Sequence, residues 1–104
     1  MPVEKRNLRK SHPNHAIMVA ELVKHLGDDP SLPPTPRIIE EEDRLSRSMH
    51  VYVFWDEWQS VAEQERSEII LEAYQQARGQ AEMLRITVAM GLTPLEAKNL
   101  GLAA

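Results

Sequence analysis

The sequence predicts a small α+β domain of two layers, in which a three-stranded mixed sheet is packed by helices in the order α-β-β-α-β-α. Three stretches carry this prediction. Residues 50–58, HVYVFWDEW, hold four of the five aromatic side chains in an alternating pattern that favours a strand. Residues 61–78 form the longest helical pattern, and residues 82–90 alternate apolar and polar side chains as a further strand does.

The composition fits one soluble domain. With 104 residues, of which 42% are hydrophobic and 27% charged, the chain can bury one core. The absence of cysteine excludes a disulfide, a thiolate nucleophile and a zinc-thiolate site, and no stretch approaches the roughly 20 apolar residues that span a bilayer. We therefore expect a cytoplasmic protein without a membrane partner.

The charge is divided unevenly along the chain. The net charge is -4, but residues 1–10 carry four cations against Glu4, which leaves the remaining residues near -7. An acidic body disfavours nucleic-acid binding, because phosphate neutralisation needs a basic face. We expect residues 1–12 to be a flexible basic arm and residues 13–104 to be a single domain.

A first helix is predicted over residues 13–26, before Gly27. Its apolar side chains recur at i, i+3, i+4 and i+7, and they are Val19, Leu22, Val23 and Leu26. His12 and His15 lie one turn apart, but two imidazoles without a third ligand make a poor metal site. Residues 27–36 contain four of the seven prolines and predict an extended connector.

Residues 37–54 are predicted to form a β-hairpin with a polar connection. Ile38 and Ile39 point to opposite faces of its first strand, and the acidic run at 40–43 suits an exposed edge, where charge discourages pairing with another chain. Carboxylates can bind a divalent cation, but successive strand residues alternate faces, and this run lacks the spacing and glycine of a calcium loop. We therefore predict no metal site here.

The second strand of the hairpin is apolar on both faces. The two faces are formed by Val51, Val53 and Trp55 and by His50, Tyr52 and Phe54. The long helix should cover the first face. The second face needs a cover of its own, which is another helix, a protein partner or a nucleic-acid base. Exposed Tyr52 and Phe54 could stack on bases, at about 1–3 kcal/mol per base.

The long helix is predicted to begin at a capping box formed by Ser60 and Glu63, and to end at Gly79. Its inward face is predicted to hold Arg66, Ile69, Ile70, Ala73, Tyr74 and Ala77. Its outward face is predicted to hold Glu65, Glu68, Glu72 and Gln75.

The C-terminal part is predicted to contain a strand and a short helix. Residues 82–90 favour a strand, although a helix remains possible there. Thr93, Pro94 and Glu96 supply a cap, a first-turn proline and a capping-box acid, which predict a last helix that ends near Gly101.

The element order resembles that of KH-like domains, and the chain from Val51 onward resembles the BolA-like family. That family has a V-x-V strand, an aromatic residue, an arginine eight positions later in an E-R-H-R-type segment, a helix, an apolar strand and a Thr-Pro pair. The matching positions are Trp58, Glu65, Arg66, Thr93 and Pro94. The resemblance covers about half of the chain and implies a KH/BolA-like fold.

The same resemblance implies less about function. BolA-like proteins are associated with monothiol glutaredoxins and shared iron-sulfur clusters, which they bind through histidine and cysteine or histidine ligands. Here Ser67 replaces the E-R-H-R histidine, Met83 or Glu82 stands where the strand histidine would be, and there is no cysteine. We predict no cofactor.

The sequence therefore predicts a non-enzymatic domain for protein interaction or self-association, which uses an exposed sheet face or the acidic edge. A KH-like module for single-stranded nucleic acid is the alternative, although no GXXG loop is present. No catalytic set is recognised, because Asp56, Glu57 and His50 have no nucleophile or phosphate loop beside them. The hypothetical binding residues are His50, Tyr52, Phe54, Trp58 and Arg66.

Overall fold

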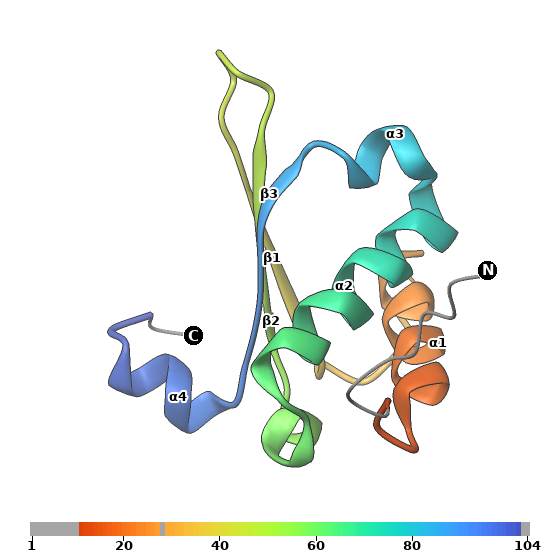
Figure 1. Cartoon of the computed structure of the whole chain (residues 1–104), viewed down its shortest axis with the longest axis vertical. Coiled ribbons are helices and arrows are strands. Elements are labelled where there is room, and N and C mark those ends of the chain that lie inside the picture. The colour runs from red at the N-terminus through yellow and green to blue at the C-terminus, as the bar shows by residue number, and fades with distance from the viewer. Residues whose placement is uncertain (1–10, 28, 103–104) are drawn as a thin grey trace, which may run out of the picture.

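The computed structural model describes residues 11–27 and 29–102, and it confirms the predicted α+β class (Figure 1). Its elements are the helices α1 (His15–Leu26), α2 (Glu63–Arg78), α3 (Gln80–Met83) and α4 (Pro94–Asn99), the 3₁₀ helix η1 (Asp56–Ser60), and the strands β1 (Arg37–Glu42), β2 (Met49–Phe54) and β3 (Ile86–Leu92). The predicted arm at residues 1–12 lies outside the described residues except for Ser11 and His12.

The sheet has the order β1-β2-β3 and is mixed, as predicted. β1 and β2 form an antiparallel hairpin, and β3 pairs parallel to β2 after the crossover through α2. A bulge between Met49 and His50 shifts the β2–β3 register. The aromatic-rich strand β2 is therefore the centre of the sheet, with a neighbour on each side.

The main core lies between the sheet and the helices α1 and α2, which cover one face of it (Figure 1). Val51, Val53 and Trp55 are buried on this face, as the alternation in β2 predicts. The largest fully buried side chains are Trp58, Tyr74, Leu22, Ile69, Ile70, Val51 and Val53. Because burying each large apolar side chain contributes about 1.5–3 kcal/mol, this layer supplies most of the hydrophobic stabilisation.

The predicted start of α2 is wrong. Ser60 is the last residue of η1, α2 begins at Glu63 after the N-cap residue Ala62, and Ala62 makes no side-chain cap. The reason is Trp58, which is fully buried and turns the chain through η1 before the helix can start. Tertiary burial here overrides the local capping pattern.

The two faces of α2 are predicted correctly except at one position on each. The inward residues from Arg66 to Tyr74 are buried, but Ala77 is exposed. On the other side Glu65 is buried rather than exposed, because α1 lies against it. His15 Nδ1 lies 2.7 Å from Glu65 Oε2, and the backbone N–H of His12 donates to the same oxygen at 2.7 Å.

The predicted third strand begins too early. The chain forms the short helix α3 after Gly79, whose φ of +89° suits glycine and separates α3 from α2. Arg85 then donates to Glu82, three residues before it, as side chains on one helical turn do. The strand β3 begins only afterwards and runs over Ile86–Leu92. The last helix is confirmed, since Thr93 and Glu96 form the predicted capping box of α4.

Candidate functional site

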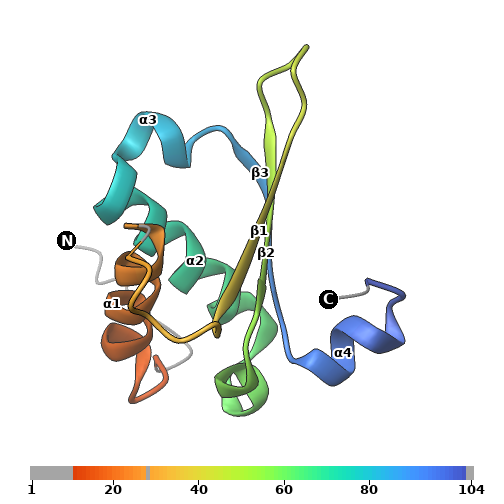
Figure 2. The ribbon, with the colours of Figure 1, turned by 180° about the vertical axis from the view of Figure 1, so that it is seen from behind.

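The sheet face opposite α1 and α2 is the candidate site, because much of it has no helix over it (Figure 2). Two rows of side chains across the three strands form what we call the open face. The first row is Ile39, Tyr52 and Met90, and the second row is Glu41, His50 and Val88. Glu41 and His50 are exposed, Met90 is 36% exposed, and the other three are half-buried.

The helix α4 bounds the open face at one end. Phe54, Leu92 and Ala97 form a small second core beneath α4, and Ile39 and Tyr52 pack against its edge. Phe54 is therefore covered by the protein itself, whereas Tyr52 is covered only in part. Leu95 on α4 and Leu100, which follows this helix, are exposed.

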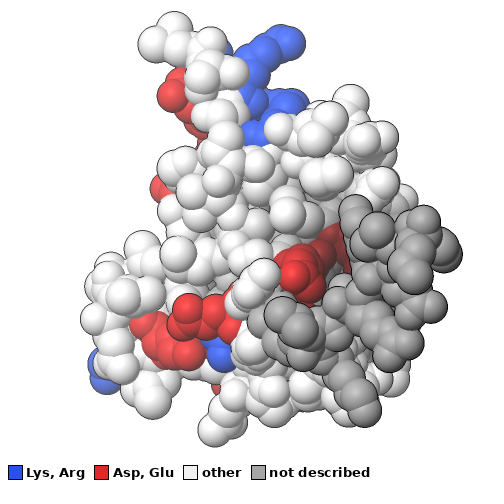
Figure 3. Space-filling model, viewed as in Figure 1, with Lys and Arg blue, Asp and Glu red and all other residues white. Residues whose placement is uncertain are grey.

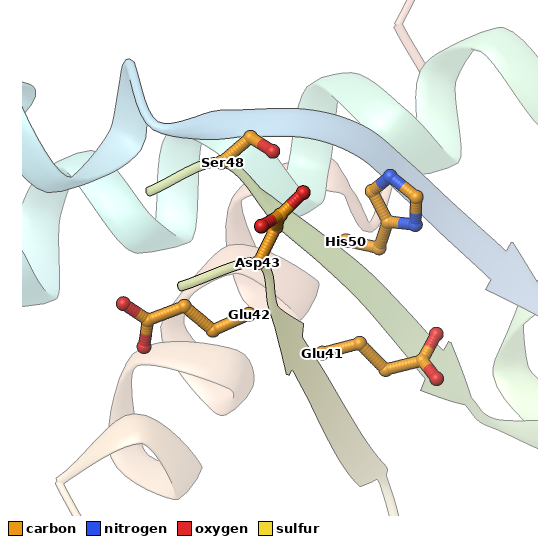
Figure 4. A pocket seen from close by; sticks show the side chains of 5 residues that line it. All are labelled: Glu41, Glu42, Asp43, Ser48 and His50. Carbon is orange, nitrogen blue, oxygen red and sulfur yellow. The ribbon is translucent and has the colours of Figure 1, made fainter. Parts of the chain in front are cut away.

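The other end of the open face is acidic. Glu41, Glu42, Asp43, Ser48 and His50 line a shallow recess of about 250 Å³ beside the hairpin loop (Figure 4). The backbone N–H groups of Leu45 and Ser46 donate to Asp43 and hold the pKa of its carboxyl below the usual value. Burial, followed by the nearby charge of Glu41, raises the pKa of the Tyr52 hydroxyl. This end therefore carries carboxylate charge at neutral pH.

These carboxylates do not make a metal centre. In residues 11–27 and 29–102, no group of three histidine, aspartate or glutamate side chains is placed to hold a metal ion. Glu41 and Glu42 leave β1 on opposite faces of the sheet. The acidic end can attract a cation on a partner, but its side chains do not converge on one point.

Two of the hypothetical binding residues, Trp58 and Arg66, lie in the interior instead. Trp58 Nε1 donates to the carbonyl of Val53 at 3.0 Å. Arg66 Nε donates to the carbonyl of Val61 at 2.8 Å, and its Nη1 donates to the carbonyl of Gly91 at 3.1 Å. Both side chains are buried, and their hydrogen bonds stabilise the junction of α2 and β3.

Arg66 also fixes the helix that bounds the open face. Its Nη1 donates to Glu96 Oε1 at 2.6 Å, and the same carboxylate oxygen accepts from the backbone N–H of Thr93 at 2.8 Å. The hydrogen bond from the Thr93 N–H lowers the pKa of the Glu96 carboxyl most, and the hydrogen bond from Arg66 lowers it further. The ion pair joins the start of α4 to α2, and it thereby sets where the open face ends.

Comparison with known proteins finds no relative of this chain. No family model, curated protein or solved structure matches the chain. The BolA-like and KH-like resemblance therefore stays a prediction. Of the residues that carry it, Arg66 contacts Gly91 and is linked through Glu96 to Thr93, whereas Glu65 contacts His12 and His15 instead.

Sequence reasoning missed the role of α4. The capping box predicts the helix, but no local pattern indicates that Ala97 packs on Phe54 from the far side of the sheet. It also missed Glu96 as the partner of Arg66, which lies 30 residues away. The available signal was the buried position of an arginine on the inward face of α2, since a buried guanidinium needs an anionic or carbonyl partner.

No helix within the described parts of the chain is both long and apolar enough to cross a membrane.

Proposed function

We propose that the protein is a non-enzymatic interaction domain whose open face binds an apolar segment of a partner protein that carries lysine or arginine at one end. The supporting observation is the open face itself. Ile39, Tyr52, Val88 and Met90 remain partly exposed across three strands. Contiguous apolar surface that a fold leaves uncovered is typical of an interaction site.

The charges at the end of this surface favour a basic segment. Glu41 and Asp43 lie at the hairpin end, and neither has an ion pair among the residues that the structure describes. Opposite charges at the rim of an apolar contact set orientation and raise the association rate more than they raise affinity. A segment that places its apolar side chains on the first row and a cation at Glu41 would satisfy both features.

Single-stranded nucleic acid suits this face less well. An aromatic platform would need Tyr52 and Phe54 together, but α4 covers Phe54. The carboxylates of Glu41 and Asp43 would also repel a phosphate backbone. No observation on the sheet favours this alternative.

The proposal can be tested by selecting binders from a phage library of random 12-residue peptides on the immobilised chain. We expect enriched peptides to combine apolar residues with lysine or arginine. Their affinity should fall at least tenfold for Val88→Glu with Met90→Glu, because two charges would enter the apolar contact. Leu84→Ser is the control, since Leu84 is 68% exposed but lies outside the open face.

Two results would contradict the proposal. One is a selection without enriched peptides. The other is equal peptide binding by the wild type and the Val88→Glu, Met90→Glu variant, after thermal unfolding has shown that both are folded. Enrichment of acidic peptides would also count against it, because the charge complementarity would then be reversed.

A further inference from the structure

The loop between β1 and β2 presents an apolar side chain between two cations. This loop, residues 43–48, projects beyond the rest of the molecule (Figure 1). Leu45 at its end is 98% exposed, and Arg44 and Arg47 beside it are exposed as well. Arginine side chains lie at this end of the molecule, with acidic side chains beside them (Figure 3). Neither Arg44 nor Arg47 has a side-chain ion pair within the described residues.

The loop is held in one conformation by its own hydrogen bonds. Asp43 Oδ1 accepts from the backbone N–H of Leu45 at 2.9 Å, and the carbonyl of Asp43 accepts from the N–H of Arg47 at 2.8 Å. Arg85, the residue before β3, donates through Nε to the carbonyl of Arg47 at 2.9 Å. A loop that is already ordered loses less conformational entropy on binding, so the backbone around the exposed leucine adds little to the entropic cost of association.

A groove of complementary character lies at the opposite end of the chain's long axis. It has a volume of about 390 Å³, within the range of small binding pockets, and it is lined by Asn14, Ile17, Met18, Glu21, Trp55 and Glu57. Ile17 is 63% exposed and forms its apolar side with Met18 and Trp55. Glu21 and Glu57 supply two carboxylates to the same groove.

Both carboxylates are open to a new partner. Glu57 has no ion pair among the described residues, and Glu21 has only the exposed Lys24, at 3.4 Å in the same helix. Exposed pairs of this kind contribute little and exchange readily. An arginine from outside can therefore approach Glu21 and Glu57 without breaking a buried interaction.

We propose that the hairpin loop of one copy docks into the α1–η1 groove of a second copy, with Leu45 on Ile17 and Trp55 and with Arg44 and Arg47 at the two glutamates. Two observations support this occupant: the loop offers an exposed leucine between two arginines, and the groove offers an apolar side chain beside two carboxylates. The loop and the groove lie at opposite ends of the molecule, so one chain cannot bring them together (Figure 1). A contact between different surfaces of identical chains is heterologous, and it builds a ring or an open chain.

The contact uses neither row of the open face, and Asp43 is the one residue that the loop shares with the acidic end of that face. The Val88→Glu, Met90→Glu variant therefore separates this contact from the proposed function. One loop in one groove buries less than the area of a standard protein interface. We therefore expect weak association, with a Kd of roughly 0.1–1 mM. The two arginine–glutamate pairs are solvent-exposed, so the association should weaken as the ionic strength rises.

Sedimentation equilibrium of the full chain between about 10 μM and 1 mM tests this inference. The average mass should rise with concentration above the 11.9 kDa of one chain, and it should fall when salt is added. Leu45→Ser should lower the association constant at least tenfold. Leu84→Ser, which removes another exposed leucine, should leave it within about twofold.

Charge reversal gives the sharper test. Arg44→Glu with Arg47→Glu should abolish association because an acidic loop meets an acidic groove. Glu21→Lys with Glu57→Lys should abolish it because a basic loop meets a basic groove. An equimolar mixture of the two variants should associate again, since each loop then finds a groove of opposite charge.

Three outcomes would overturn the inference. They are a wild-type chain that stays monomeric up to 1 mM, association that the Leu45 and charge variants do not change, and a mixture of the charge variants that stays monomeric. Association that the Val88→Glu, Met90→Glu variant removes, but the loop variants do not, would place self-association on the open face instead.

Discussion

At Gly91 the strand β3 leaves no space for a side chain. A Cβ atom there would lie 2.8 Å from Trp58 Cε2 and 2.9 Å from the Cβ of Arg66. Both neighbours are buried, and each is tied to a backbone carbonyl by a hydrogen bond. The packing of this junction therefore depends on the absence of a single methyl group.

We expect Gly91→Ala to lower the free energy of unfolding by about 2 kcal/mol, because overpacking a close-packed interior costs about 1–3 kcal/mol. Urea unfolding measures this change. The cost should be smaller in a Trp58→Phe background, where a single smaller ring replaces the fused indole that carries Cε2 and Nε1. An equal cost in both backgrounds would show that Trp58 does not cause the conflict.

At the scale of elements, α1 is attached to α2 by a histidine between two carboxylates. His15 Nδ1 lies 2.7 Å from Glu65 Oε2, and His15 Nε2 lies 2.8 Å from Glu72 Oε2. Because both ring nitrogens face an oxygen acceptor, both must carry a proton to donate. The hydrogen bond with Glu72 is the largest cause that raises the pKa of His15 above 6.5. The neighbouring His12 ring is bonded to Ser60 instead.

The stability that His15 contributes should therefore depend on pH. Its folded-state pKa is raised, so the contribution is fully present below about pH 6.5 and is lost as the pH rises through the higher folded-state pKa. Relative to His15→Gln, the wild type should be more stable by about 1 kcal/mol at pH 5.5, with a smaller difference at pH 9. Urea unfolding at both pH values measures it.

His12→Gln is the matched control for this effect. The His12 ring lies 3.2 Å from the Ser60 hydroxyl and accepts from the Asn14 N–H at 3.1 Å, so this substitution removes a neighbouring imidazole and keeps the one between Glu65 and Glu72. If the His15→Gln cost is the same at pH 5.5 and pH 9, the two carboxylates do not hold a charged imidazole.

The elements differ in how far sequence alone predicts them. The two faces of β2 follow from strict alternation, and the start of α4 follows from the capping box of Thr93 and Glu96. The start of α2 does not, because the buried Trp58 moves the first helical turn past Ser60. The predicted start of the third strand at Glu82 is wrong for a local reason, because Glu82 and Arg85 pair within a turn before β3 begins.

For the whole molecule, the sequence predicts the class and the order of the main elements, whereas the site depends on contacts between distant segments. The alternation in β2 indicates that its second face needs a cover. The structure supplies α4 for Phe54 and leaves Tyr52 and His50 at the surface. The hypothesis that His50, Tyr52, Phe54, Trp58 and Arg66 form one binding surface stays a prediction, and the proposed function retains His50 and Tyr52.

The central claim is that the open face is the binding surface, and NMR of the ¹⁵N-labelled full chain tests it most directly. A peptide enriched by the phage selection is titrated into the chain, and the amide shifts are followed. We expect the largest changes at Ile39, Tyr52, Val88 and Met90, with smaller changes in the exposed part of α4. Changes confined to α2, α3 or the α1–η1 groove, with the open face unaltered, would contradict the account.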